Sequence, residues 1–166
     1  MKKIVPASQS KIVIRDAGEK DVPFFEELYF KTRHNEFTQL DWDEIQLEKF
    51  LQMQFNMQTQ SYKMQFPDAR ISVIESGGAA VGRLITTGEI RLVDITVLPE
   101  SRNHGIGSFV LNRLLNKAKG KGKFVDLQVL KSNVAATRLY ERFGFEKTGE
   151  NELYFMMRWQ KFVELN

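Results

Sequence analysis

The chain has no cysteine and only two histidines, His34 and His104. Without cysteine there is no disulfide, no thiolate metal ligand and no cysteine nucleophile. Two histidines far apart in sequence give little basis for a His-rich zinc site, so we expect no metal. The sequence also lacks any apolar run near the ~18 residues that a membrane span needs. The opening stretch MKKIVPASQS lacks the apolar segment of a secretory signal, so we expect a cytoplasmic protein that does not contact a membrane.

A strong excess of charge of one sign is missing as well. The net charge of +3 is too small to favour nucleic acid as a partner. The basic residues are unevenly placed, and five of them lie close together: Arg113, Lys117, Lys119, Lys121 and Lys123. They are interpreted either as a solvated helix end, where cations suit the helix dipole, or as help for a polyanionic ligand. A hydrophobic content of 42% supports one domain, placed at residues 11–166 after a flexible tail at residues 1–10.

Hydrophobic periodicity predicts an α/β chain. Helical spacing runs from about Asp21 to Thr32, with Pro23 in the first turn, and from about Asp43 to Met64. Strands are predicted at residues 11–15, 69–75, 79–87, 89–98, 123–130, 145–150 and 152–159. Two further helices, one after a glycine turn and one ending at Gly144, complete the order β-α-α-β-β-β-α-β-α-β-β. The hairpins imply antiparallel neighbours and the helical crossovers imply parallel ones, so a mixed sheet is expected.

The glycine turn lies in the stretch Glu100–Leu115, which reads ESRNHGIGSFVLNRLL. A P-loop is a poor match because no lysine follows Gly107, and a dinucleotide fingerprint is a poor match because Val110 replaces its third glycine. A pyrophosphate suits the turn better. The first turn of a helix has free N–H groups, Gly105 lets phosphate oxygens approach, and Arg102 adds a cation. A purely structural turn is the remaining alternative.

Two segments together resemble the GNAT acetyltransferase superfamily. The stretch VLPESRNHGIGSFVLNRLL is similar to the acyl-CoA pyrophosphate loop of that family, and LQVLKSNVAATRLYERFGFEKTGE is similar to its strand, asparagine and tyrosine-bearing helix. The motifs cover about residues 89–150, and the order of elements matches over residues 11–160. The resemblance implies a GNAT-like α+β fold with a mixed central sheet and a splayed acyl-CoA cleft. It also implies an N-acetyltransferase that moves an acetyl group from acetyl-CoA directly to a primary amine of a small molecule or a protein.

The resemblance further assigns cofactor-binding roles to three groups of residues. The backbone of the strand before the loop would form hydrogen bonds with the pantetheine arm of acetyl-CoA, and the loop would bind the pyrophosphate. An asparagine side chain would form a hydrogen bond with the same arm, and two small residues near it would let the arm approach. These residues are Ile95, Thr96, Val97, Arg102, Asn103, His104, Gly105, Ile106, Gly107, Ser108, Asn133, Ala135 and Ala136. Asn133 is equally interpreted as a helix N-cap, and His104 as a loop donor rather than a base.

Tyr140 matches the tyrosine with which the family protonates the departing thiolate, although a core tyrosine is the alternative. A tyrosine of pKa about 10 is protonated at neutral pH, and the thiolate's conjugate acid has a pKa of about 8.5. The general base is less clear, because Gln128 stands where some relatives place a glutamate. Glu89 and Asp94 are therefore candidates, directly or through ordered water, and either could instead be a solvent-facing strand residue.

No motif identifies the acyl acceptor. Its groove is expected within residues 30–64, where the available side chains include His34, Glu36, Phe37, Trp42, Gln54 and Gln58. The acidic residues Glu36, Asp41, Asp43 and Glu44 could attract an amine or belong to a solvated helix start. The rival hypotheses are a non-catalytic sensor or partner domain that binds coenzyme A, and a nucleotide binder. The family alone implies a possible homodimer through the C-terminal strands.

Overall fold

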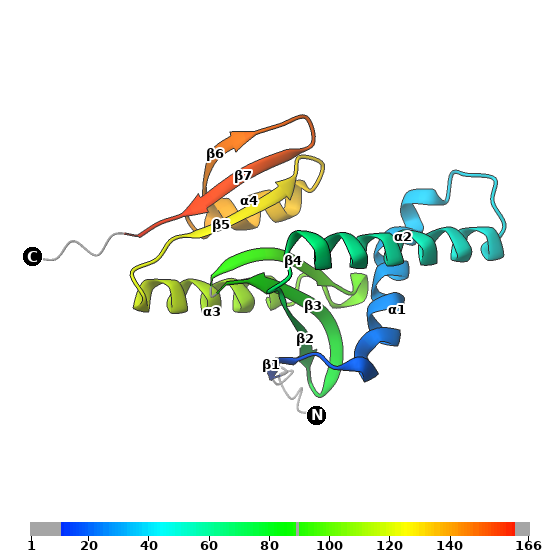
Figure 1. Ribbon diagram of the computed structural model, residues 1–166, viewed down its shortest axis with the longest axis horizontal. Helices are drawn as coiled ribbons and strands as arrows, with labels where there is room; N and C mark the ends of the chain where they lie inside the picture. The colour runs from blue at the N-terminus through cyan, green and yellow to red at the C-terminus, as the bar shows by residue number, and fades with distance from the viewer. Residues whose placement is uncertain (1–10, 89, 162–166) are drawn as a thin grey trace, which may run out of the picture.

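The computed structural model describes residues 11–88 and 90–161. Its seven strands form two sheets, with orders β1-β2-β3-β4 and β5-β7-β6 (Figure 1). The strands are β1 (Ile12–Asp16), β2 (Arg70–Ser76), β3 (Ala79–Thr87), β4 (Arg91–Val97), β5 (Val125–Leu130), β6 (Glu146–Glu150) and β7 (Tyr154–Trp159), and the helices are α1 (Val22–Arg33), α2 (Glu44–Gln65), α3 (Ile106–Gly120) and α4 (Val134–Arg142). The predicted order of elements is confirmed, with most boundaries shifted by one or two residues.

Local sequence determines where the first two helices begin. Asp43 is the N-cap of α2: its carboxylate accepts a hydrogen bond from Gln46 N at 2.8 Å, and the Gln46 side chain accepts one from Asp43 N. α1 begins directly after Asp21, as predicted, but the Asp21 carboxylate does not cap it. That carboxylate instead accepts two hydrogen bonds from Arg15 on β1, and this pairing lowers the pKa of Asp21. The interaction fastens α1 to the edge of the four-stranded sheet.

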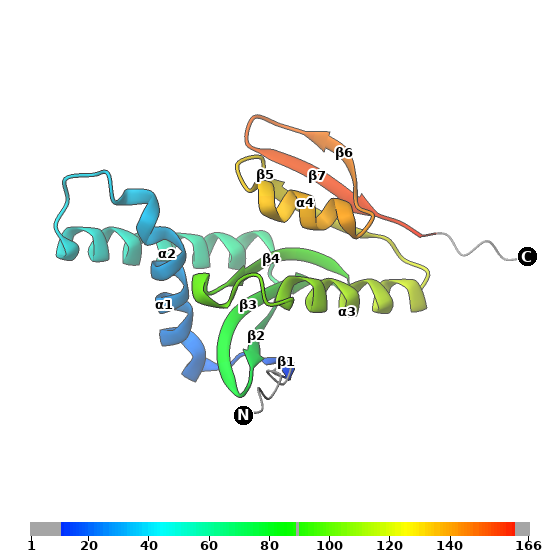
Figure 2. The same cartoon turned by 180° about the vertical axis from the view of Figure 1, so that it is seen from behind.

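Side chains alternate between the two faces of the four-stranded sheet, and helices cover both faces. Val73 of β2 packs with Phe25 of α1 and Leu51 of α2, whereas the neighbouring Ile74 packs with Leu111 of α3. α1 and α2 therefore cover one face (Figure 1), and α3 covers the other (Figure 2). Each side chain of β3 and β4 thus reaches either the α1–α2 face or the α3 face.

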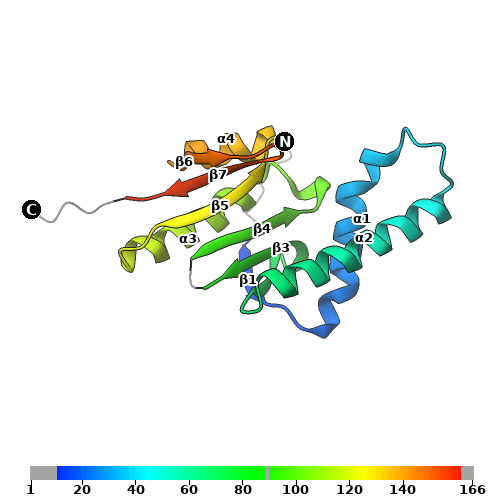
Figure 3. The same cartoon turned by 45° about the horizontal axis from the view of Figure 1, so that its top comes forward.

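The two sheets meet where β4 and β5 lie side by side and run in the same direction (Figure 3). The described strands form no hydrogen-bonded ladder between β4 and β5, and every described ladder is antiparallel. The parallel neighbours of the predicted mixed sheet are therefore present, but they are splayed apart. β4 also carries a bulge, because Ile85 pairs with Asp94 and Thr86 with Leu92, which leaves Val93 over. A bulge bends its strand and increases its twist, which suits this splay.

Candidate functional site

The glycine turn places the N-terminus of α3 close to the end of β4. Gly105 is the N-cap of α3 and adopts a left-handed conformation with φ of 79°. A Cβ on Gly105 would have no protein atom within 4 Å, so the space in front of the helix is open. No side chain in the described part of the chain caps the N-terminus of α3. Its first N–H groups and the positive end of its dipole are therefore available to an anion such as a pyrophosphate.

Two other residues of this loop have structural contacts. Arg102 Nε donates to Val97 O at 3.2 Å, which fastens the loop to the end of β4. A guanidinium has five N–H donors, so Arg102 keeps others for a ligand. Gly107 allows close packing of the two helices, because a Cβ there would lie 2.9 Å from Leu139 Cδ2 of α4. Gly107 therefore has a packing role in addition to its predicted place in the pyrophosphate loop.

The remaining predicted loop residues differ in exposure. Asn103 and His104 are exposed, and Asn103 has a positive φ of 62°. Ile106 is buried in the core at 4% exposure, so only its backbone could meet a ligand. Ser108 is half-buried in the first turn of α3. Together these positions form one short surface around the helix end.

β4 is hydrogen-bonded to β3 on one side only, and its other edge faces β5. Ile95 and Val97 pack toward α3, while Thr96 lies on the α1–α2 face. The backbone edge at these three residues is thus open to an extended ligand arm. Gly82 on β3 determines how closely the strands approach, because a Cβ there would lie 2.6 Å from Thr96 O.

Asn133 is the N-cap of α4, and its Oδ1 accepts a hydrogen bond from Ala136 N at 3.1 Å. This contact confirms the capping interpretation. The amide N–H₂ of the same side chain keeps its donors, so the predicted pantetheine contact is compatible with the cap. Ala135 is exposed and Ala136 is half-buried. Because their side chains are small, these two alanines project little from α4 next to Asn133.

Asp94 belongs to an ion pair between β3 and β4. Its Oδ2 accepts hydrogen bonds from Arg83 Nη2 at 2.9 Å and from Thr96 Oγ1 at 3.0 Å. The Arg83 side chain is 8% exposed and that of Asp94 is 22% exposed, so Asp94 is not a solvent-facing strand residue. No described residue donates to Asp94 Oδ1, which leaves that oxygen for a proton or a water. Glu89, the other candidate base, lies outside the described residues.

Three of the four tyrosines of the chain are within electrostatic reach of this ion pair. Tyr140 of α4 is 5% exposed, and burial together with the nearby Asp94 charge raises its pKa. Burial, followed by the charge of Asp94, raises the pKa of Tyr62 on α2 to about 12. Tyr29 on α1 and Tyr154 on β7 lie close enough to act on Tyr62 electrostatically. Because a raised pKa keeps a phenol protonated, Tyr62 and Tyr140 are neutral at pH 7.

The hydroxyl of Tyr140 has no hydrogen-bond partner among the described residues, and its ring packs against Phe145 at a centroid distance of 5.6 Å. Of the three predicted catalytic residues, Tyr140 and Asp94 are close enough for the charge of Asp94 to raise the pKa of the phenol.

A cavity of about 90 Å³ lies beside Arg83 on the α1–α2 face. It is lined by Phe25, Leu28, Tyr29, Thr32, Arg33, Gln58, Arg83 and Thr96. Arg83 Nη2 donates to Gln58 Oε1 at 3.3 Å, whereas Arg83 Nε is buried without a partner among the described residues. A buried donor without a partner costs about 1–3 kcal/mol, and more on a charged group. Of the six side chains predicted for the acceptor groove, Gln58 alone lines this cavity.

The other residues predicted for acceptor binding make structural contacts. Phe37 and Trp42 pack edge-on against Phe50, and Gln54 accepts a hydrogen bond from Tyr29 at 3.5 Å. The acidic residues are placed as follows: Glu36 pairs with Arg33 at 2.8 Å, Asp43 caps α2, Glu44 lies 3.4 Å from His34, and Asp41 is exposed. These contacts fit a solvated helix start better than a site that attracts an amine.

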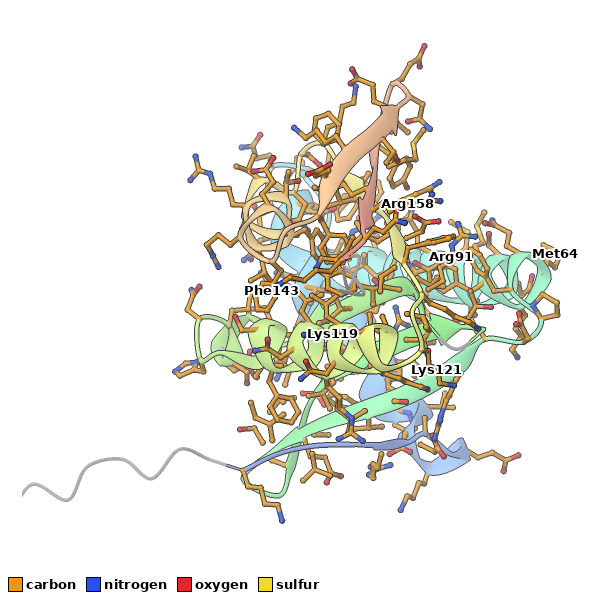
Figure 4. All side chains as sticks on the ribbon, turned by 90° about the vertical axis from the view of Figure 1, so that its left-hand side faces the viewer. Met64, Arg91, Lys119, Lys121, Phe143 and Arg158 are labelled. Carbon is orange, nitrogen blue, oxygen red and sulfur yellow. The ribbon has the colours of Figure 1, made fainter. Side chains whose placement is uncertain are left out.

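The basic group lies at the far end of α3 from the glycine turn. Lys117 and Lys119 are in its last turn, and Lys121 follows the helix (Figure 4). The helix has 15 residues. At about 1.5 Å per residue this separates the lysines from the turn by about 20 Å. The cations therefore suit the helix end and are too distant to contact a pyrophosphate at Gly105. Within residues 11–88 and 90–161, no helix could span a membrane and no group of three metal-ligating side chains is found.

Three residues of the site were missed from sequence: Gly82, Arg83 and Tyr62. Arg83 did carry a signal, because it is the one charged residue in the apolar run AAVGRLITT, and charged residues are seldom buried unless paired. Tyr62 carried one as well, because it continues the apolar face of α2 that Leu47, Leu51 and Phe55 form at i, i+4 and i+8. The significance of Gly82 depends on the position of β4, which local sequence does not determine.

Comparison with known proteins gives a consistent result. The sequence model of the acetyltransferase (GNAT) family matches residues 25–145. The structure is similar to PaiA N-acetyltransferase from Thermoplasma acidophilum in complex with coenzyme A, with a TM-score of 0.67 and 16% identity over 91% of this chain and 99% of that one. It is also similar to the ribosomal alpha-N-protein acetyltransferase RimL in complex with coenzyme A, with a TM-score of 0.62 and 18% identity over 93% and 96% of the two chains.

A third similar structure is a spermidine N-acetyltransferase SpeG chimera from Vibrio cholerae and hSSAT, with a TM-score of 0.61 and 18% identity over 91% of this chain and 96% of that one. At these identities the likeness shows the fold. No curated protein sequence matches the chain.

Proposed function

The chain belongs to the acetyltransferase (GNAT) family, and from this premise we propose that it transfers an acetyl group from acetyl-CoA directly to a primary amine. The observation that carries the proposal is the splay between β4 and β5. The open N-terminus of α3 follows β4 in the chain, and the phenol of Tyr140 is within electrostatic reach of Asp94 on β4. These features support an anion site, an extended backbone edge for the arm of acetyl-CoA and a nearby proton donor.

The loop and strand residues would hold the acyl donor by their backbones. The N–H groups at the start of α3 face open space and suit the two phosphates. The edge of β4 at Ile95–Val97 suits the amide groups of the pantetheine arm, and Asn133 keeps N–H donors beside it. Acetyl-CoA itself supplies an activated thioester.

Transfer to an amine removes one proton from nitrogen, forms a C–N bond, breaks a C–S bond and delivers one proton to sulfur. Tyr140 holds the proton for sulfur, because its raised pKa keeps the phenol neutral. Asp94 Oδ1 takes the proton of the amine, directly or through a water, since Oδ2 is committed to Arg83 and Thr96. An acceptor that arrives as an ammonium ion first releases one additional proton to solvent, which at pH 7 costs about 4.6 kcal/mol for an amine of pKa about 10.4 and about 1 kcal/mol for an α-amine. Direct transfer is also consistent with the lack of cysteine, since no thiol can carry the acetyl group.

The proposal is tested by measuring the release of coenzyme A thiol from acetyl-CoA with a panel of small amines, polyamines and peptides. Turnover with at least one amine is expected. Binding of acetyl-CoA without turnover of any amine would support the sensor hypothesis instead. Thermal stabilisation by NAD or ATP, but not by coenzyme A, would support the nucleotide binder and overturn the proposal.

A further inference from the structure

The Arg83 guanidinium has more donors than its partners use. Nη2 is hydrogen-bonded to Asp94 and Gln58, and Nε is buried with no partner among the described residues. The residue is 7% exposed, so bulk solvent does not compensate that group. Buried polar atoms in folded proteins nearly always have a partner, so a buried guanidinium whose described partners bind only one of its nitrogens is unusual. Arg83 also lines the cavity described above.

The cavity lined by Arg83 is cationic. Arg33 is the second guanidinium in its wall, and no carboxylate is among its lining residues. Arg33 Nε donates to Glu36 and Arg33 Nη1 to Tyr29, which leaves further N–H groups on the fork. The counter-charges Asp94 and Glu36 are thus outside the wall. The wall therefore provides N–H donors from two guanidinium groups to a ligand in the cavity.

The size and place of the cavity restrict its occupant. A volume of about 90 Å³ exceeds the roughly 30 Å³ share of one water and is smaller than the roughly 150 Å³ that accommodates benzene. Thr96 is part of its wall, so the cavity borders the strand whose open edge faces the splay. Asp94, a predicted base, is hydrogen-bonded to Arg83 Nη2 at 2.9 Å. A group bound at Arg83 therefore lies next to a predicted catalytic residue.

We propose that this cavity binds the carboxylate of the acyl acceptor through the guanidinium groups of Arg83 and Arg33, and that the acceptor is a small amino-carboxylate. The proposal rests on the proposed acetyl transfer and names its substrate class. A carboxylate is planar, small enough for the space, and matches the fork geometry of a guanidinium. The amine at the other end of the molecule is then directed to Asp94 and the splay.

The first test is direct binding to the unmodified protein. The Arg83 Nε–H signal is assigned in a ¹H–¹⁵N NMR spectrum by its loss in Arg83→Lys, and alanine, β-alanine and γ-aminobutyrate are titrated in turn, each against its carboxamide. We expect at least one amino acid to shift that signal and its carboxamide to leave it in place. A signal that no carboxylate moves would mean that only water occupies the cavity, and would overturn the proposal.

The second test is kinetic and uses the same three pairs with acetyl-CoA. We expect kcat/KM at least 10-fold higher for one carboxylate than for its carboxamide, in line with the strength of a charged hydrogen bond. Arg83→Lys retains a cation for Asp94 but loses the fork, so it should raise KM for that carboxylate about 10- to 100-fold and leave KM for the carboxamide unchanged. Arg113→Lys on the exposed face of α3 is the matched control and should change neither value.

Equal kcat/KM for carboxylates and carboxamides in the unmodified protein would overturn the proposal without any variant. Calorimetric binding of acetyl-CoA, measured alongside, separates the two hypotheses. If acetyl-CoA binds and amines turn over without carboxylate preference, the substrate class is wrong while the acetyl transfer stands. If acetyl-CoA does not bind, the acetyl transfer fails, and the amino-carboxylate acceptor that rests on it fails as well.

Discussion

Asp94→Asn should destabilise the protein by about 3–5 kcal/mol, because it leaves the Arg83 guanidinium inside the protein without its counter-charge. The two groups are 2.9 Å apart, and the Arg83 side chain is 8% exposed. Coulomb's law with an effective dielectric constant near 20 gives a gross attraction of about 6 kcal/mol, part of which only offsets desolvation. Domains of this kind unfold with about 5–15 kcal/mol, so the loss takes a large share of the stability.

Denaturant unfolding of a double-mutant cycle measures this interaction. The variants are Asp94→Asn, Arg83→Gln and the pair together. The double variant removes both charges, so it should be more stable than the sum of the single losses predicts, by about 2–3 kcal/mol. The exposed pair of Asp16 and Arg70, 2.6 Å apart with side chains 66% and 65% exposed, is the matched control and should be close to additive. Additive losses at Arg83 and Asp94 would refute the buried-pair reasoning.

Four further changes test other parts of the site. Tyr140→Phe should lower kcat about 10²- to 10⁴-fold with little change in acetyl-CoA affinity, and an unchanged kcat would remove Tyr140 from the chemistry. Gly105→Val places a β-branched residue at φ of 79° in front of α3 and should weaken coenzyme A binding at least about 10-fold by calorimetry; unaltered affinity would mean that this loop does not hold the pyrophosphate. Gly82→Ala should cost about 1–3 kcal/mol in thermal unfolding, because its Cβ would lie 2.6 Å from Thr96 O, whereas Gly18→Ala has no protein atom within 4 Å of the new Cβ and should cost far less. The pKa of Tyr62 is raised to about 12, so its side chain should stay a neutral phenol when the pH passes the ordinary value of about 10. Its contribution to stability is therefore complete below pH 10 and is lost as the pH rises through 12. Phenolate absorbance that rises in one step near pH 10 for all the tyrosines would contradict this.

The order of helices and strands could be predicted because it depends on local periodicity and turn residues. The hairpin glycines Gly77 and Gly78 both have positive φ, and Gly144 ends α4 in the left-handed region, as their positions in sequence indicated. The same local reasoning failed at Asp21, whose carboxylate could either cap a helix or meet a distant arginine. Arg15 is that arginine, and its position beside Asp21 depends on tertiary packing and not on local sequence.

The candidate site shows the same division between local and distant information. The loop before α3 was recognised because its residues are consecutive in sequence. The pairing of Arg83 with Asp94 was not, because it depends on the register between β3 and β4, which the bulge at Val93 shifts by one residue. Without the register, Asp94 can be described only as an acidic residue on a strand. The register shows that its Oδ2 is paired with Arg83, while its Oδ1 has no donor among the described residues.

The splay between β4 and β5 also has a consequence for how the molecule opens. The two sheets share an apolar core, in which Leu84 and Leu127 both take part, but no ladder joins them along the chain that the structure describes. We therefore expect the segment from β5 to β7 to open more readily than the sheet β1 to β4. An arm of coenzyme A bound between β4 and β5 would join the two sheets, so amide exchange in β7, which the arm does not touch, should slow when coenzyme A is added. The donor substrate would then act as a structural part of the folded protein.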